Sequence, residues 1–185
     1  MRYLSIVVLA IVLVSSPAFA GEPLTPRPLD PIAVEAFERA HAQSAKVRSL
    51  VATLESSNVI VHIVSTRSLP ESVGGMTQFV TSRGGFRYVR ITIAVGFSEA
   101  GRAVILAHEL QHACEIAASG ADDVESLKRL FEKAGHRAGD YFETRAAIDA
   151  EHLVRSELNA ARASRTLRLR SGQALQAEPV VKFDH

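Results

Sequence analysis

The segment from Val104 to Cys114 contains the pattern His-Glu-x-x-His, with histidines at positions 108 and 112. Residues four apart on an α-helix lie about 40° apart around its axis, so His108 and His112 leave the same face one turn apart. Two neutral imidazoles can share one tetrahedral zinc ion, and the intervening Glu109 keeps a carboxylate free to act as a general base. The spacing therefore predicts a hydrolytic zinc site.

The surrounding residues favour the helix that this chemistry requires. Between Val104 and Cys114 the chain has no proline, and Glu109 is the only acidic or basic residue besides the two histidines. Cys114 follows His112 by two positions, about 200° around the helix, so we expect a small buried residue that faces away from the metal. As the only cysteine of the chain it cannot form an intramolecular disulfide.

Catalytic zinc is usually held by three protein ligands and a water molecule, so a third ligand must come from another element. Glu143 is the best candidate, because it heads an otherwise apolar stripe at helical spacing, and a buried carboxylate needs a partner. The rest of this stripe is Ala147, Ala150, Val154 and Leu158. The competing interpretation is a glutamate in the first turn of a helix that only favours the helix dipole.

Four residues near Glu143 are alternative ligands or partners. His136, in a glycine-containing loop, could bind the metal or donate to the transition state, and Tyr141 could donate to an oxyanion. Asp149 and His152 share the predicted helix of Glu143, and Asp149 could instead accept the outer N–H of a ligand histidine. The third position therefore stays open among Glu143, His136, Asp149 and His152. We expect His41 to lie on the surface or behind the metal ligands, and His62 to have a structural role in its strand.

The motif at 108–112, followed by Glu143 on a later helix, resembles the gluzincin group of zinc metallopeptidases, and more narrowly its small secreted forms. The resemblance covers residues 58–158 and implies a small zincin-like fold, with Glu143 as third ligand by its order in the chain. The sequence departs from the usual signature of the group at Ala147, four positions after Glu143. It also lacks the third histidine of the extended metzincin motif.

Motif and resemblance together imply a secreted metallopeptidase with Zn²⁺ as cofactor and a peptide or protein as substrate. Zinc held by His108, His112 and Glu143 would lower the pKa of its bound water. Glu109 would take the proton of that water and deliver it to the leaving amine. An extended substrate would pair with an exposed edge of the predicted sheet.

Two other functions compete with this one. The first is a non-catalytic binding or scaffold protein on a peptidase-like fold, with a structural metal or none. The second is an exported helical protein in which the motif is accidental. Glu109 favours the enzyme, because a purely structural zinc site has no use for this carboxylate.

Residues 1–20 have the pattern of a secretory signal peptide. Arg2 precedes the apolar run Leu4–Val14, and the small-x-small sequence Ala18–Ala20 precedes Gly21. The apolar run is shorter than the roughly 20 residues of a membrane-spanning helix. We therefore expect cleavage and export to the periplasm or beyond, with no membrane association afterwards.

The remaining chain has the length of one domain. We expect a single zincin-like metallopeptidase domain at 21–163 and a flexible tail at 164–185, where no apolar period is sustained. The net charge is +1, and no basic cluster contains interleaved aromatic residues, so we expect no nucleic-acid partner.

The elements that must position this chemistry follow from periodicity and capping residues. We expect an α+β fold with an N-terminal helix, a three-stranded mainly antiparallel sheet, the motif helix and a downstream glutamate helix. The predicted elements are a helix from Asp30 to Ser56, a buried strand from Asn58 to Ser65, a hairpin of Thr77–Ser82 and Phe86–Val95, the motif helix from Ser98 to Ser119, a short helix from Val124 to Lys133, and a helix from Asp140 to Ala163.

Overall fold

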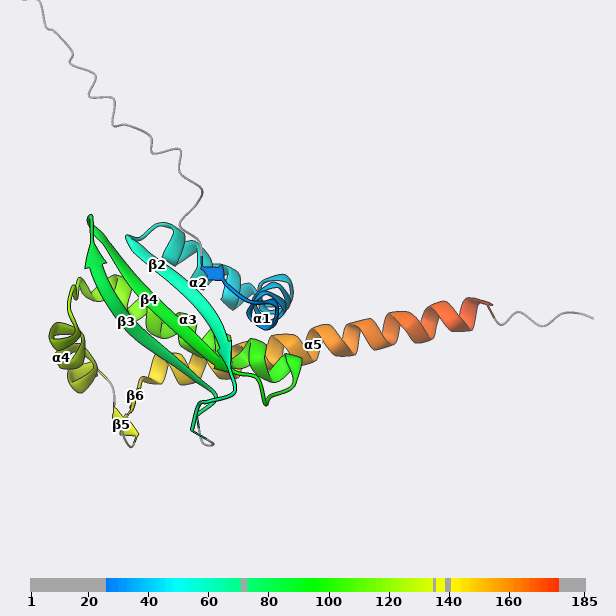
Figure 1. Ribbon diagram of the computed structural model, residues 1–185. Coiled ribbons are helices and arrows are strands. Elements are labelled where there is room, and N and C mark those ends of the chain that lie inside the picture. Colours follow the sequence, from blue (N-terminus) through cyan, green and yellow to red (C-terminus); the bar gives the residue numbers. More distant parts are fainter. Residues whose placement is uncertain (1–25, 71–72, 135, 139–140, 177–185) are drawn as a thin grey trace, which may run out of the picture.

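A mixed β-sheet carries helices on one of its faces (Figure 1). The computed structural model describes residues 26–70, 73–134, 136–138 and 141–176. The sheet order is β1 (Arg27–Pro28), β2 (Val59–Thr66), β4 (Phe86–Ala94) and β3 (Gly75–Arg83). Both β1 and β4 run parallel to β2, and β3 is antiparallel to β4. The α+β class is confirmed, but the prediction of a three-stranded, mainly antiparallel sheet is wrong, because this sheet has four strands and two of its three pairings are parallel.

The path of the chain explains why the sheet is mixed. After β2 the chain passes over one strand position to form β3 at the edge, and β4 then returns between β2 and β3. Gly84 and Gly85 form the two-residue turn of this predicted hairpin, and their positive φ angles of 62° and 81° suit such a turn. Alternation in β4 buries Val89, Ile91 and Ile93 as expected. Alternation does not reveal strand direction, so it could not exclude the antiparallel sheet.

Two helices replace the single N-terminal helix that the sequence predicted. Helix α1 (Pro31–Gln43) and helix α2 (Ala45–Glu55) are separated by Ser44, whose backbone is extended. The Ser44 hydroxyl accepts the N–H of Val47 at 3.0 Å and so caps α2. Because serine caps a helix better than it continues one, the chain breaks there and turns.

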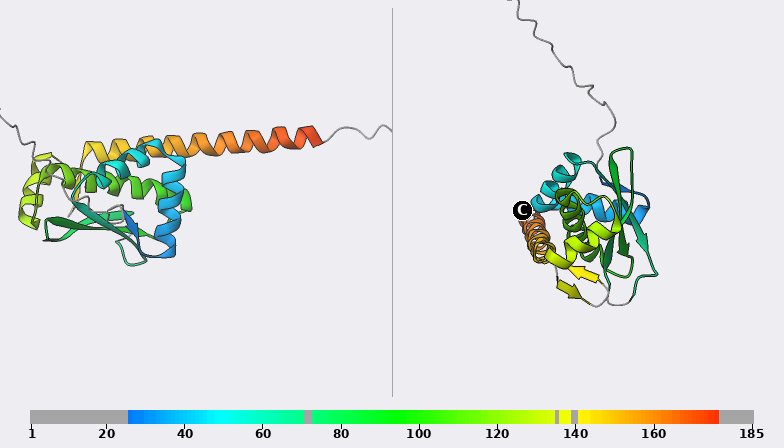
Figure 2. Two further views of the ribbon diagram at one scale, coloured as in Figure 1. Left: turned by 90° about the horizontal axis from the view of Figure 1, so that it is seen from above. Right: turned by 90° about the vertical axis from the view of Figure 1, so that its left-hand side faces the viewer.

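Helix α3 (Glu99–Ser119) carries the motif and matches its predicted bounds. The Ser98 hydroxyl caps its first turn, and Gly120 ends it with a left-handed φ of 69°. Figure 2 shows α3 between the sheet and the long helix α5. The core between α3 and the sheet consists of fully buried aliphatic side chains, among them Leu106, Leu110, Ile116, Ile63, Ile91 and Ile93.

The segment after α3 differs most from expectation. Helix α4 (Val124–Ala134) matches its prediction, but the small hairpin of β5 (His136–Ala138) and β6 (Tyr141–Glu143) was not foreseen. Helix α5 spans Arg145–Gln176, so the prediction that it would begin at Asp140 and end near Ala163 is wrong. Glu143 therefore ends a strand and does not lie on the helix. The second half of α5 extends beyond the rest of the fold (Figures 1 and 2). Its sequence is rich in residues with high intrinsic helix propensity, which favour a helix even where no other element packs against it.

Two predictions concern residues outside the described part of the chain: the signal peptide at 1–20 and the last nine residues of the tail. Among the described helices, none combines the length and the apolar character needed to cross a membrane.

Candidate metal centre

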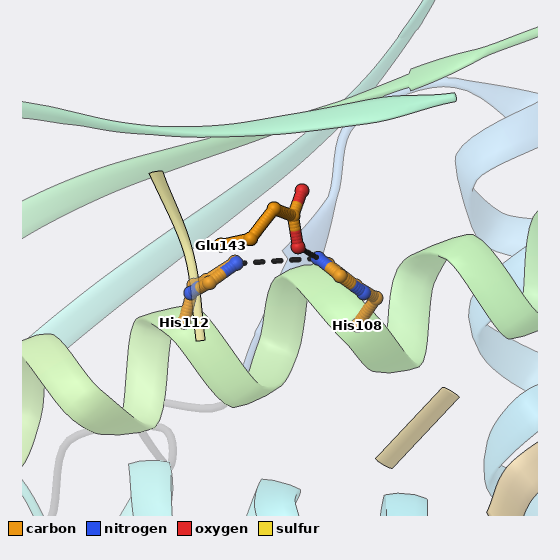
Figure 3. Close-up of side chains that lie close together, drawn as sticks. All are labelled: His108, His112 and Glu143. Carbon is orange, nitrogen blue, oxygen red and sulfur yellow. Dashed lines mark hydrogen bonds and ion pairs between the residues drawn. The ribbon is translucent and has the colours of Figure 1, made fainter. Parts of the chain in front are cut away.

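The side chains of His108, His112 and Glu143 converge (Figure 3). Each offers one ligand atom, and the three atoms lie within 4.8 Å of one another. Nε2 of His108 is 3.0 Å from Oε2 of Glu143 and 3.2 Å from Nε2 of His112. The histidines come from successive turns of α3, and Glu143 reaches them from the end of β6. The structure thus brings together the three residues that the sequence analysis favoured.

The three converging atoms have too few hydrogen-bond donors between them, which favours a cation at their centre. Nδ1 of His112 lies 2.9 Å from the Glu115 carboxylate, which assigns the ring proton to Nδ1 and leaves Nε2 with a lone pair. Nε2 of His108 then faces two acceptors, the lone pair of His112 and the Glu143 carboxylate. A single N–H can satisfy only one of them. A metal ion would satisfy all three atoms, and two imidazoles with one carboxylate are a ligand set that suits catalytic zinc.

Negative charge surrounds His108. Burial alone would lower the pKa of this histidine, because its side chain is only 12% exposed. The hydrogen bond to Glu143 and the charges of Glu109, Glu143 and Glu151 outweigh burial and raise the pKa above its ordinary value. A site that favours a proton on this imidazole for such reasons also favours a metal cation beside it.

Glu109 is close to the cluster without belonging to it. Its side chain is buried, and Oε2 accepts a hydrogen bond of 2.7 Å from the Thr77 hydroxyl on β3. Burial raises the pKa of Glu109, while the Thr77 hydrogen bond and the two motif histidines oppose that rise. This carboxylate is therefore held in place and remains distinct from the three converging ligand atoms, as a general base must be.

A cavity of about 730 Å³ opens beside the three converging side chains and Glu109. Strand β3 lines it with residues 75–77, and α3 lines it with the motif. Helix α4 and β6 contribute apolar side chains, including Leu127, Phe131 and Phe142. The ring of Phe131 stands edge-on to His112, with centroids 5.6 Å apart, and stacks on Phe142 at 6.3 Å. The candidate centre therefore has room for a ligand with an apolar group.

The start of strand β3 lies directly on the face of α3 that carries Ile105 and Glu109. A Cβ atom added at Gly75 would stand 2.7 Å from Cγ2 of Ile105 and 2.8 Å from Oε1 of Glu109. At Gly74 the added atom would lie 2.9 Å from Cδ1 of Ile105. These glycines are needed because backbone and helix approach more closely than a side chain allows.

The alternative ligands whose side chains the structure describes do not join the cluster. Asp149 is exposed and pairs with Arg145 at 2.9 Å. His152 is exposed on α5. His136 pairs with Glu143 in the β5–β6 ladder, but its side chain lies outside what the structure describes, as does that of Tyr141.

Three other residues that the sequence analysis considered lie outside the described cluster. His41 stacks on Phe37 of α1 with ring centroids 5.8 Å apart, and His62 lies 6.5 Å from Tyr88. Cys114 is buried, with Sγ 3.5 Å from a backbone carbonyl of α2. Burial raises the pKa of this thiol to about 12, so it carries no thiolate at neutral pH.

Sequence reasoning missed the residues that support the cluster: Thr77, Glu115, Thr144 and Glu151. Glu115 alone had a local signal, because it follows His112 by three positions and so shares its helix face. Thr77, Thr144 and Glu151 approach through tertiary packing, which no spacing along the chain reveals.

Comparison with protein families, with curated proteins and with solved structures finds no match to this chain. The gluzincin resemblance therefore remains a prediction that rests on the motif and on the order of residues.

Proposed function

We propose that this chain is a zinc-dependent metallopeptidase that hydrolyses peptide bonds. The observation that carries the proposal is the convergence of His108, His112 and Glu143 beside the buried carboxylate of Glu109, at the wall of a cavity. A structural metal site is usually closed, with four protein ligands. Here three candidate ligands border open space, which favours an enzyme over a scaffold.

The residues of the chain divide the chemistry between them. Zinc, when bound, would supply a water of lowered pKa and would polarise the scissile carbonyl. Glu109 accepts the proton of the attacking water and returns it to the leaving amine. Thr77 donates to Oε2 of Glu109, which fixes the carboxylate and leaves Oε1 as the oxygen that would take the proton.

The shape of the site favours an extended peptide as substrate. Among the described strands, β3 is an edge strand that pairs only with β4, and residues 75–77 of β3 line the cavity. A peptide that pairs with this edge would run alongside α3 and could present its carbonyl to the metal. The apolar side chains of Leu127, Phe131 and Phe142 would receive an apolar side chain of that peptide. The pattern of residues 1–20 adds export to the proposal.

Zinc content measured beside activity tests this function. We expect one zinc ion per chain in the wild type, and His108→Ala or His112→Ala should abolish tight binding because two ligands cannot complete the shell. Glu109→Gln is nearly isosteric but cannot accept the proton of the water. It should keep zinc and lose about 10²–10⁴-fold of the activity on a denatured protein substrate.

The same measurements distinguish the competing functions. A zinc-binding wild type without hydrolytic activity would support the scaffold protein, and a wild type that binds no zinc would make the motif accidental. Full activity in Glu109→Gln would end the peptidase proposal.

A further inference from the structure

The Glu115 carboxylate contacts both parts of the chain that form the candidate metal centre: His112 on α3, and Thr144, which directly follows Glu143. It lies on α3 one turn after His112, and its Oε2 is 2.9 Å from Nδ1 of that histidine. Its other oxygen, Oε1, accepts a hydrogen bond of 2.7 Å from the Thr144 hydroxyl. The side chain of Glu115 is 19% exposed, so solvent competes little for either contact.

The contact with His112 fixes how that ring would meet a metal. Hydrogen bonding at Nδ1 holds the proton there, orients the ring and makes Nε2 a better donor. His108 has no equivalent partner among the described residues: its Nδ1 makes no hydrogen bond, although Oε2 of Glu151 lies 3.4 Å away. Glu115 thus orients one of the two histidines by a hydrogen bond of good length.

The contact with Thr144 connects Glu115 to the segment that carries Glu143. Thr144 is buried, directly follows Glu143, and accepts the N–H of Ala147 at 3.1 Å, so its hydroxyl also caps α5. When that hydroxyl donates to Glu115, the junction between β6 and α5 is tied to α3. Glu143 is held beside this junction, one residue before the cap.

We infer that Glu115 is a positioning residue that orients His112 and also holds the Glu143 junction against α3, an inference that rests on the proposed metal site. A carboxylate four positions after Glu143 is absent, since Ala147 stands there. Glu115 supplies the orienting carboxylate from the motif helix itself. The competing role, a purely structural tie between α3 and α5, predicts lost stability with unchanged metal affinity.

The dissociation constant for zinc, measured by competition with a chelator, separates these roles. We expect Glu115→Ala to weaken zinc binding by about 10–100-fold, the usual effect of removing the partner of a metal-bound histidine. Glu115→Gln keeps an acceptor for Nδ1 but loses the charge, so its loss should be smaller. The absorption spectrum of the cobalt-substituted protein should also change in Glu115→Ala, because the ligand geometry changes.

Glu157 offers a matched control for stability. Its carboxylate also accepts a hydroxyl, that of Ser44, together with the backbone N–H of Lys46, and it joins α5 to the start of α2. Glu157→Ala should lower the Tm of the metal-free protein without altering the zinc dissociation constant or the cobalt spectrum.

Thr144 provides the second pair of variants. Thr144→Val removes the hydroxyl and should weaken zinc binding, and Thr144→Ser should restore it. These variants also decide the matter if Glu115→Ala does not fold. Wild-type zinc affinity in Glu115→Gln, Thr144→Val and any folded Glu115→Ala protein would overturn the inference. A wild type that binds no zinc would refute the proposed function itself, so the two failures are distinguishable.

Discussion

Replacement of Gly75 by alanine tests whether β3 must lie against the face of α3 that carries Glu109. The added Cβ would stand 2.7 Å from Cγ2 of Ile105 and 2.9 Å from Cγ of Glu109. Non-bonded carbons prefer a separation of about 3.5–4.0 Å, so strand and helix would have to part by about 1 Å. Ile105 cannot readily give way, because a β-branched side chain in a helix has one strongly preferred rotamer.

This displacement should affect stability and activity to different extents. We expect Gly75→Ala to lower the free energy of unfolding by about 1–3 kcal/mol, the usual cost of an overpacked contact. Each kcal/mol corresponds to about 2–4 °C in Tm for a protein of this length. Activity should fall by about 100-fold, because a shift of about 1 Å in a catalytic group has that effect. Zinc content should stay unchanged, since Glu109 is outside the ligand cluster.

Thermal unfolding, zinc content and hydrolysis of a denatured protein substrate, all assayed well below the lower Tm, measure these effects. Gly96→Ala is the matched control, because its added Cβ meets no atom within 4 Å and its φ is outside the left-handed region. That control should change the free energy of unfolding by less than about 0.5 kcal/mol. If Gly75→Ala has the Tm and activity of the wild type, β3 does not constrain Glu109 as argued.

Two further predictions concern the elements that hold the centre in place. The buried guanidinium of Arg87 on β4 donates to two carbonyls in the last turn of α3, at 2.7 and 3.0 Å, and to the carbonyl of Ala121 just after the helix, at 3.2 Å. Arg87→Met should therefore lower the free energy of unfolding, measured in urea, by about 2–4 kcal/mol. Arg90 is exposed on the same strand, so Arg90→Met is the control and should hardly change this free energy. Equal losses in the two variants would contradict the role of Arg87. Asp30 caps α1 and accepts hydrogen bonds from Ser65; burial alone would raise its pKa, but these hydrogen bonds hold the pKa below its ordinary 3.8. The Asp30 carboxylate thus stabilises the fold above about pH 4, and this contribution disappears as the pH falls through the lowered pKa. Asp30→Ala should lose about 1 kcal/mol at pH 7, with a difference from wild type that shrinks in acid, and a difference independent of pH would refute the assignment.

The parts of the fold that the sequence predicted are those set by local chemistry. The bounds of α3 follow from the cap at Ser98 and the left-handed Gly120, both of which act within one turn. The hairpin follows from alternation on either side of Gly84 and Gly85. Helical geometry alone places the two motif histidines on the same face of α3.

The parts that the sequence did not predict depend on distant partners. The alternation in β4 fits either pairing direction, so its parallel alignment with β2 was not foreseeable. Ser44 interrupts the N-terminal helix where its hydroxyl can cap α2 and also donate to Glu157, more than a hundred residues away. A helical pattern on both sides of a serine does not reveal such a partner.

The position of Glu143 depends both on local helical spacing, which the sequence shows, and on a distant contact, which it does not. The stripe of Ala147, Ala150, Val154 and Leu158 is buried as the helical spacing predicted, and its small residues allow α5 to lie close to α3. Glu143 was assigned to the same helix, yet α5 begins only at Arg145. The difference arises because the Thr144 hydroxyl binds Glu115 and caps the N-terminus of α5, so that the helix begins at Arg145, two residues after Glu143. At the end of a strand, Glu143 can direct its carboxylate toward Nε2 of His108, whereas a glutamate in the first helical turn would be constrained to the face of the stripe. The cap that makes α5 begin later than predicted is therefore also what allows Glu143 to reach His108 and His112.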